Sequence, residues 1–422
     1  MNILIVGDLF GFPNFAGSGA TTRVQAYARG LLANGARVKV ICVEPTERGV
    51  ATVNTQVKGV VDGVEFEYTY GSTARPAPGL KRRLLKITKW WRFLQAVRTW
   101  APESGGVDAM IVYSRKSPWI AAARLACWLA GAVLIHEDVE RPFVWHADDP
   151  RTATRRWIYE HITFKSFDGC LAISTYLKDY CEAHVRSGAA VLVVPILVDV
   201  SEFTGAEDED LTIDERVVYC GSLSHPQSVS VIETFAAVAD EFPGLRAQLI
   251  GGSRRPAAEG ELRELARELG VADRVEFAGR VAREDLIRLL RTARVLVLPR
   301  SRDAAAEAAA AAALPTKVGE YLATGRPVVV SAAGDIPRYL TDGVDAYLAP
   351  STDVEAFSER LRYALSHPAE ADLVGKRGRE TARESFDPVS HGARILAFAD
   401  QLRASGAAAS WRARAATWRN GR

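Results

Sequence analysis

The chain has 422 residues, of which 48% are hydrophobic and 25% are charged, and its formal net charge is +2. This length indicates two or three domains, because single cores rarely grow beyond about 250–300 residues. The composition is typical of a chain with a packed core, and the small net charge excludes a protein that binds polyanions over its whole surface.

The cysteines and the N-terminus favour a reducing, cytoplasmic compartment. The five cysteines lie far apart, and no pair has the spacing of a zinc site or a redox motif. The chain begins with an apolar strand rather than with a basic region and a cleavable apolar stretch. The most apolar longer window, 118–135, is interrupted by Arg124. It therefore predicts a buried helix followed by a strand rather than a membrane span.

The first half of the chain alternates strand and helix patterns. Apolar runs rich in β-branched residues predict strands, and runs with helical periodicity between them predict helices. The predicted strands are 2–6, 38–43, 64–68, 109–113 and 133–136, and the predicted helices are 21–34 and 118–129. This alternation is typical of a doubly wound, parallel α/β sheet.

The second half repeats the alternation. The predicted strands are 217–221, 246–250, 275–278, 295–299 and 327–331, and the predicted helices are 229–242, 259–269, 283–292 and 316–324. The acidic segment 202–215 contains few apolar residues and predicts a linker. We therefore expect two Rossmann-like domains, 1–203 and 204–388, followed by a C-terminal helix and basic tail, 389–422, that packs back on the first domain. Because ligands bind beyond the carboxyl ends of such strands, two facing domains predict a cleft.

Segment 314–329 carries the most chemistry. Pro315 favours a helix start and Gly325 its end. Lys317 falls in the first turn, where it and the backbone N–H groups can bind a diphosphate. Glu320 lies on the same face one turn later, where its carboxylate can accept two hydrogen bonds from a ribose diol. The alternative is an ordinary surface helix with a Lys–Glu pair.

This segment resembles the donor-binding signature of GT-B glycosyltransferases of family 4. Its pattern Pro-x-Lys-x-x-Glu-Tyr-x-Ala-x-Gly-x-Pro-Val-Val is similar to that of one branch of the family. Further similar segments cover most of the chain, namely 168–174, 194–203, 219–223, 277–281, 334–337, 342–343 and 349–350. The resemblance implies an α/β protein of GT-B architecture, whose parallel sheets face each other across a cleft. It also implies a retaining hexosyltransferase that moves a sugar from a nucleotide-diphosphate donor to a glycan, a lipid-linked sugar or a small molecule.

The resemblance extends to individual site residues. The expected donor-binding residues are Gly17, Gly19, Gly221, Ser222, Gly279, Val281, Arg300, Lys317 and Glu320. The expected catalytic residues are His136 and Lys317, and the expected acceptor-binding residues are Arg23 and Glu137. A flexible glycine loop and a structural histidine are the alternatives for Gly17, Gly19 and His136. We expect neither a metal nor a cofactor, because the nucleotide sugar is a co-substrate and the carboxylates near His136 have no accompanying ligand set.

The sequence departs from the family pattern in three ways. Ala312 occupies the position of the family's first glutamate. Either Glu307 supplies a carboxylate from a rearranged loop, or Lys317 and main-chain amides act in its place. The usual arginine and lysine after Gly221 are absent, and segment 303–313 is almost entirely alanine. Neutralisation of the diphosphate therefore depends on Lys317, a helix N-terminus and Arg300.

Residues 80–100 predict a basic helix with interleaved aromatic residues, a pattern that suits an anionic membrane surface. The expected contacts are Lys81, Arg82, Arg83, Lys86, Trp90 and Trp91. They predict a peripheral protein on the cytoplasmic face of the membrane, and the basic tail 410–422 repeats the theme. The alternative is that the aromatic residues pack on the first domain. No nucleic-acid motif accompanies the charge, so we expect no nucleic acid partner.

Other functions remain open. A nucleotide-sugar epimerase can share the two-domain fold, and Ala312 favours a non-catalytic homologue that acts as a partner or scaffold. An NAD-dependent dehydrogenase is disfavoured, because no Gly-x-Gly-x-x-Gly follows the first strand of either domain.

Overall fold

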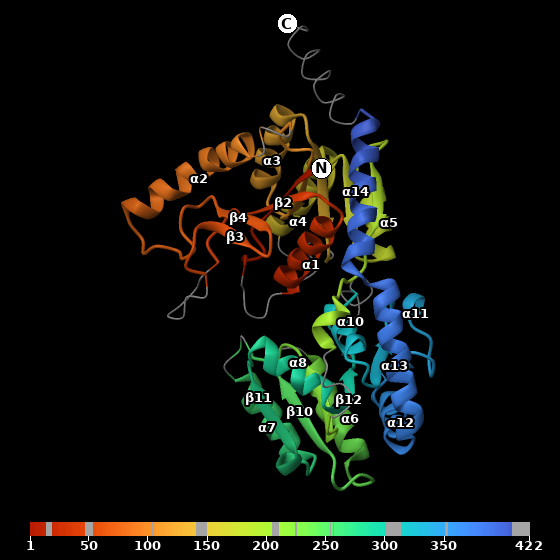
Figure 1. Cartoon of the computed structure of the whole chain (residues 1–422). Helices are drawn as coiled ribbons and strands as arrows, with labels where there is room; N and C mark the ends of the chain where they lie inside the picture. The colour runs from red at the N-terminus through yellow and green to blue at the C-terminus, as the bar shows by residue number, and fades with distance from the viewer. Residues whose placement is uncertain are drawn as a thin grey trace, which may run out of the picture. The chain divides into compact units, whose positions relative to one another are not determined.

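The structure is a computed structural model that describes residues 1–13, 19–46, 54–100, 102, 105–140, 150–204, 211–223, 226–253, 255, 257–300, 314–350 and 353–406. The chain forms two compact units. One contains residues 1–195 and the chain from Pro388 onward, and the other contains residues 196–387. We predicted these boundaries at residues 203 and 388. Each unit is built on one sheet with helices packed on it (Figure 1).

The N-terminal unit contains an eight-stranded sheet in the order β3-β4-β2-β1-β5-β6-β7-β8. Its strands are β1 (Asn2–Gly7), β2 (Arg37–Cys42), β3 (Lys58–Val61), β4 (Val64–Tyr68), β5 (Ala109–Tyr113), β6 (Val133–Asp138), β7 (Gly169–Ala172) and β8 (Ala190–Val193). All neighbours are parallel except β3 and β4. The central strands are buried, which explains why they are nearly continuous apolar runs. The five predicted strands are confirmed, whereas β3, β7 and β8 were not predicted.

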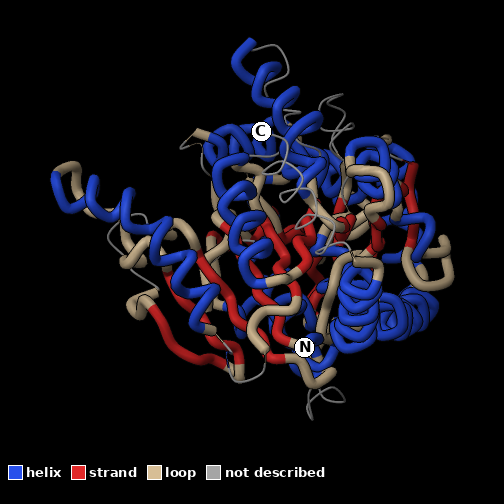
Figure 2. The backbone as a smooth tube through the Cα atoms, turned by 90° about the horizontal axis from the view of Figure 1, so that it is seen from above, coloured by secondary structure: helices blue, strands red, loops and turns tan. Residues whose placement is uncertain are grey.

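Helices pack on this sheet. They are α1 (Gly19–Ala33), α2 (Leu80–Thr99), α3 (Ser117–Ala130), α4 (Pro150–Ile158), α5 (Thr175–His184) and α14 (Pro388–Ala404). Helix α14 returns to the N-terminal unit and packs closely on α1, because Gly30 and Gly392 face each other without side chains. A Cβ atom at Gly30 would lie 1.9 Å from the carbonyl oxygen of Pro388. The first turns of α2 project away from the sheet (Figures 1 and 2).

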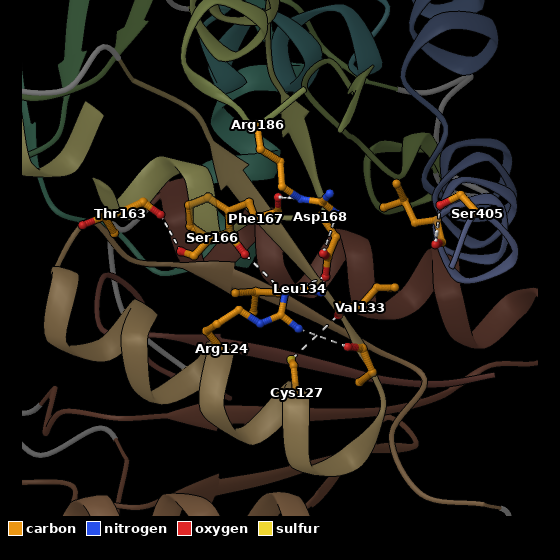
Figure 3. A network of polar contacts seen from close by, with 12 residues as sticks. Arg124, Cys127, Val133, Leu134, Thr163, Ser166, Phe167, Asp168, Arg186 and Ser405 are labelled. Carbon is orange, nitrogen blue, oxygen red and sulfur yellow. Dashed lines mark hydrogen bonds and ion pairs between the residues drawn. The ribbon is translucent and has the colours of Figure 1, made fainter. Parts of the chain in front are cut away.

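A buried ion network explains the charge that interrupts the apolar window 118–135. Arg124 Nη1 lies 2.8 Å from Asp168 Oδ2, and Arg186 Nη2 lies 3.0 Å from Asp168 Oδ1 (Figure 3). The backbone N–H of Leu134 also donates to Asp168, at 2.7 Å. Because two cations and an amide satisfy this fully buried carboxylate, the network joins α3 to the strands β6 and β7.

The C-terminal unit contains a six-stranded, entirely parallel sheet in the order β11-β10-β9-β12-β13-β14. Its strands are β9 (Asp214–Cys220), β10 (Arg246–Ile250), β11 (Val275–Gly279), β12 (Ala293–Leu298), β13 (Val328–Ala332) and β14 (Tyr347–Pro350). Its helices are α6 (Pro226–Ala239), α7 (Ala258–Glu268), α8 (Arg283–Arg291), α10 (Thr316–Ala323), α11 (Ile336–Tyr339), α12 (Val354–Ser366) and α13 (Pro368–Ser385). The strand order reverses between β9 and β12, so ligands are expected beyond the carboxyl ends of these strands. Two Rossmann-like sheets, as predicted, are therefore confirmed.

None of the helices in the described part of the chain is long and apolar enough to cross a membrane. All five cysteines, Cys42, Cys127, Cys170, Cys181 and Cys220, are buried and have free thiols.

Candidate functional site

Three glycine-containing strand ends lie next to one another in the C-terminal unit. The N–H of Gly251 donates to the carbonyl of Gly279 at 2.8 Å, and the N–H of Gly221 donates to that of Ile250 at 2.9 Å. Gly251 has φ +144°, and a Cβ atom there would lie 1.8 Å from the Gly221 oxygen. Backbone therefore packs directly on backbone at the carboxyl ends of β9, β10 and β11. The predicted donor residues Gly221 and Gly279 belong to this edge.

Helix α10 is fixed against the end of β9. The Tyr321 hydroxyl accepts a 2.6 Å hydrogen bond from the backbone N–H of Cys220. Glu320, one residue earlier, is only 5% exposed. Its Oε2 accepts from Lys317 Nζ at 2.8 Å, and its Oε1 accepts from Arg283 Nη1 at 2.6 Å. The predicted pair of Lys317 and Glu320 therefore lies together at the sheet edge, with Arg283 as a third member.

Glu320, Lys317 and Arg283 each stabilise the charged form of their partner in this cluster. Burial alone would raise the pKa of Glu320, but Lys317 and Arg283 outweigh it and hold that pKa below its usual value. The same carboxylate raises the pKa of Lys317 and of Arg283 against the opposing effect of burial. Glu320 is therefore an anion at neutral pH and accepts hydrogen bonds only.

Sequence reasoning missed Arg283. It begins α8, just after the predicted donor residue Val281, and its Nη2 also lies 3.0 Å from Glu202 Oε2. Its guanidinium lies 5.1 Å from the ring centroid of Phe203. Its position two residues after Val281, in a segment that the family resemblance assigns to donor binding, was the only local sign of a role. Glu202, which the sequence assigned to the linker, lies in the short helical turn Val200–Phe203 and takes part in this cluster.

Arg300 follows β12 at the same edge. Its backbone N–H donates to Ser331 Oγ at 2.9 Å. Its Nη2 atom is buried and has no hydrogen-bond partner among the described residues. Burial lowers the pKa of Arg300 to about 10. A partly desolvated guanidinium that has no carboxylate partner among the described residues suits an anionic ligand. The neighbouring Glu307 and Ala312 lie outside the described residues.

His136 lies in the N-terminal unit, in strand β6, and is 1% exposed. Its Nδ1 lies 3.3 Å from the carbonyl oxygen of Val112, and its Nε2 lies 2.8 Å from the Tyr159 hydroxyl. The carbonyl can only accept, so Nδ1 carries the proton and Nε2 accepts from Tyr159. Burial, helped by Arg115, lowers the pKa of His136 to about 3. The ring is therefore neutral, and protein groups occupy both of its nitrogens. Its catalytic role stays a prediction.

Arg23 and Glu137 form a buried ion pair. Arg23 Nε lies 2.6 Å from Glu137 Oε1, and Arg23 also donates to the carbonyls of Val194 and Pro195 at 2.8 and 2.6 Å. The Tyr27 hydroxyl donates to the same carboxylate at 2.8 Å. These contacts join α1, β6 and the segment after β8. Binding of an acceptor by Arg23 or Glu137 stays a prediction.

The remaining predicted residues have less defined surroundings. Gly19 is the first residue of α1, whereas Gly17 lies outside the described residues. Asp138, the last residue of β6, has a pKa that burial raises to about 7. Within the described ranges, no three His, Cys, Asp or Glu side chains converge as a metal site.

The residues predicted to contact a membrane differ in exposure. Lys81, Arg83, Lys86 and Trp91 are exposed, and Arg82 is half-buried. Trp90 packs on the ring of Trp119, with 4.1 Å between the ring centroids.

Solved structures share this architecture over nearly the whole chain. The sucrose-phosphate synthase of Thermosynechococcus elongatus has a TM-score of 0.69 and 19% identity, and the match covers 96% of this chain and 100% of that one. Anabaena HepE in complex with UDP has a TM-score of 0.64 and 16% identity, covering 95% of this chain and 100% of that one. At such identities the likeness shows the fold.

Curated relatives are similar over part of the chain. A D-inositol 3-phosphate glycosyltransferase of Streptomyces avermitilis is 28% identical over 63% of this chain and 58% of its own length. A GDP-mannose-dependent phosphatidylinositol monomannoside mannosyltransferase of Mycolicibacterium smegmatis is 27% identical over 53% of this chain and 59% of its own length. The matches thus span less than two thirds of these relatives.

Two family models match the two halves of the chain. The model described as "Glycosyl transferase 4-like domain" matches residues 18–196, and that described as "Glycosyl transferases group 1" matches residues 214–367. Together they span most of the chain and agree with the fold of its two units. The chain belongs to the family-4-like glycosyltransferases of the GT-B fold.

Proposed function

We propose that this chain transfers a hexose from a nucleotide-diphosphate sugar with retention of configuration. The observation that carries the proposal is Glu320, an almost fully buried carboxylate that Lys317 and Arg283 keep ionised at the carboxyl ends of parallel strands. An ionised carboxylate can accept hydrogen bonds from both hydroxyls of a ribose. A buried anion of this kind suits the recognition of a diol.

The diphosphate would lie beside the ribose. Lys317 lies in the first turn of α10, where no described side chain caps the helix. The N–H groups of this turn, the Lys317 ammonium and the Arg300 guanidinium supply positive charge for the leaving diphosphate. The family resemblance implies a front-face substitution without a protein nucleophile. The chain's own contribution is then positioning and charge stabilisation.

Calorimetric titration tests the donor site. A panel of nucleotide-diphosphate sugars is first screened for thermal stabilisation of the chain, since a ligand that binds only the folded state raises its apparent stability. The best ligand is then titrated into the wild type, Glu320→Ala and Glu320→Gln. We expect both variants to lose at least about tenfold in affinity. Glu359→Ala, which removes an exposed glutamate of α12, is the matched control. Wild-type affinity in both Glu320 variants would refute the ribose contact.

Product analysis separates the alternatives. Incubation with donor alone yields an altered nucleotide sugar if the chain is an epimerase. Failure to bind any nucleotide favours a non-catalytic homologue. Transfer to an acceptor, with the anomeric configuration followed by NMR, identifies a retaining transferase.

The acceptor would be a glycan, a lipid-linked sugar or a small molecule bound by the N-terminal unit. The exposed basic helix α2 supports the expectation that this chemistry takes place on the cytoplasmic face of an anionic membrane.

A further inference from the structure

Helix α2 carries an apolar stripe that no described residue of its own unit covers. Leu80, Leu84, Ile87 and Trp91 are 83%, 57%, 71% and 63% exposed. Their spacing of four, three and four residues places them on one face of the helix. A different stripe, which includes Phe93, is buried in the N-terminal unit. The helix therefore has two apolar faces, only one of which serves the core.

Positive charge surrounds the exposed stripe. Lys81, Arg83 and Lys86 are exposed, and no described acidic side chain pairs with any of them. The helix contains no acidic residue. By contrast, Lys89 on the inner face is neutralised by Glu44, at 2.5 Å. Cations without a described carboxylate partner thus flank the exposed apolar side chains, at Lys81 and Arg83, and extend around the helix to Lys86.

Lys86 lines two hollows on this side of the N-terminal unit. One, of about 420 Å³, is formed by the first turns of α2 and the residues before them. The other, of about 410 Å³, is lined by Glu44, Tyr70, Arg75, Lys89, Trp90 and Lys116. Glu44, Tyr70 and Lys116 follow β2, β4 and β5, so the second hollow lies at the carboxyl ends of the sheet, where ligands of such folds bind.

The cations in the second hollow exceed its carboxylates. Lys89 pairs with Glu44, and Lys116 Nζ lies 2.6 Å from Asp8 Oδ2. Arg75 Nη2 is 4.0 Å from Glu44, which Lys89 already neutralises, and Lys86 has no described partner. The hollow therefore retains positive charge for an anionic group.

We propose that the exposed face of α2 docks on a bilayer that contains anionic phospholipid. Leu80, Leu84, Ile87 and Trp91 enter the interface, and Lys81, Arg83 and Lys86 pair with headgroup phosphates. A phosphate at Lys86 then lies beside the carboxyl ends of β2, β4 and β5. Trp90, which the sequence predicted as a membrane contact, packs on Trp119 and does not belong to this surface. Leu80, Leu84 and Ile87 of the exposed stripe belong to it instead.

The charge pattern selects this partner over two others. A second copy that paired through the same face would bring the exposed cations Lys81, Arg83 and Lys86 against those of its partner, and α2 has no acidic residue to separate them. Nucleic acid would accept the cations but has no apolar phase for the four exposed side chains. A membrane interface accommodates both the cations and the apolar side chains, since it offers anionic headgroups above hydrocarbon.

Vesicle flotation of the full chain tests the proposal. We expect binding to an equal mixture of phosphatidylcholine and phosphatidylglycerol, and weak binding to phosphatidylcholine alone. A basic residue at an anionic surface contributes about a fivefold factor, so the triple variant Lys81→Gln, Arg83→Gln, Lys86→Gln should lose about a hundredfold in partitioning. The double variant Leu84→Ser, Ile87→Ser should lose at least about tenfold.

Two control variants show whether the losses are specific to the proposed surface, one for charge and one for apolar side chains. Arg98→Gln removes an exposed cation from the far end of α2, and Leu129→Ser removes an exposed leucine from α3. Both should bind vesicles like the wild type. All variants should keep the wild-type thermal transition and donor affinity, because every altered side chain is exposed and belongs to the N-terminal unit. Failure of the donor site would therefore leave this result unaffected.

Three outcomes would overturn the proposal. The first is a wild-type chain that does not bind anionic vesicles, or triple and double variants that partition to these vesicles as strongly as the wild type. The second is a concentration-dependent dimer that Leu84→Ser, Ile87→Ser abolishes while vesicles stay unbound. The third is salt-sensitive binding to duplex DNA that the triple basic variant abolishes, again without vesicle binding.

Discussion

Arg283 Nη1 lies 2.6 Å from Glu320 Oε1, although 37 positions separate the two residues in the chain. The guanidinium keeps the buried carboxylate ionised, and it also occupies one of the oxygens that a ribose would use. A bound diol must therefore share Glu320 with Arg283 or displace it. Arg283 is in either case a positioning residue of the proposed donor site.

Replacing Arg283 should weaken donor binding and change its pH dependence. We expect Arg283→Gln to lower donor affinity about tenfold, because Glu320 loses a charged partner. The pKa of Glu320 should rise toward its usual value, so that donor affinity is lost at a higher pH on acidification. Calorimetric titration between neutral and acidic pH measures both effects. Arg288→Gln, on the exposed face of the same helix, is the control. If donor affinity were unchanged and still fell at the same acidic pH as in the wild type, the role of Arg283 would be contradicted.

Replacing Arg300 should affect the diphosphate and spare the fold. Its buried Nη2 atom has no described partner, so Arg300→Gln removes a desolvated charge and should not lower the free energy of unfolding. Affinity for a nucleoside diphosphate should fall about tenfold or more, whereas affinity for the nucleoside should not change. Titrations of both ligands make this comparison. Arg294→Gln, at the opposite end of β12, should leave both affinities intact. Equal losses for nucleoside and diphosphate would exclude a phosphate contact.

Breaking the Arg23–Glu137 pair should destabilise the N-terminal unit. Both side chains are almost fully buried, with exposed fractions of 2% and 1%, and Glu137→Gln leaves the Arg23 cation without its counter-ion. We expect a loss of about 3–5 kcal/mol in the free energy of unfolding, measured with denaturant. Glu140→Gln removes a pair whose carboxylate is 69% exposed and should cost at most about 1 kcal/mol. If Glu137→Gln instead raised the KM for the acceptor at unchanged stability, the pair would belong to the acceptor site.

His136 and Asp138 should give opposite contributions to stability as the pH changes. The folded-state pKa of His136 is lowered to about 3 from 6.5, so the unfolded chain takes up a proton below pH 6.5 that the folded chain rejects. Its contribution therefore falls by about 1.4 kcal/mol per pH unit on acidification through this window. The pKa of Asp138 is raised to about 7 from 3.8, so the folded chain retains a proton that the unfolded chain has lost. Its contribution falls as the pH rises from 3.8 to 7.

Denaturant unfolding of two variants between pH 4 and pH 7 separates these slopes. His136→Gln should retain only the Asp138 slope and lose stability as the pH rises. Asp138→Asn should retain only the His136 slope and lose stability as the pH falls. Parallel curves for the wild type and both variants would refute the assignment.

Much of the fold was predictable because the alternation of strands and helices is written in local periodicity. Most central strands were found, since buried parallel strands are continuous apolar runs. The buried strand β7 was missed, because its run of four residues is too short to stand out. The edge strands β3 and β8 were not found, because their residues are half-exposed and their pattern is weak. The return of the C-terminal helix to the first domain was predicted, but the contact between α14 and α1 depends on two glycines 362 positions apart, Gly30 and Gly392, which no local pattern connects.

The sequence by itself determined that Lys317 and Glu320 share one face of a short helix at a strand end. That conclusion needs only a helix start at Pro315, a stop at Gly325 and the spacing of a helical turn. The tertiary structure decided which distant groups complete the site: Arg283 on Glu320, the Cys220 amide on Tyr321, and an Arg300 atom without a described partner. It also decided which face of α2 is left exposed. Such contacts form through packing between elements far apart in the chain, where helical periodicity carries no information.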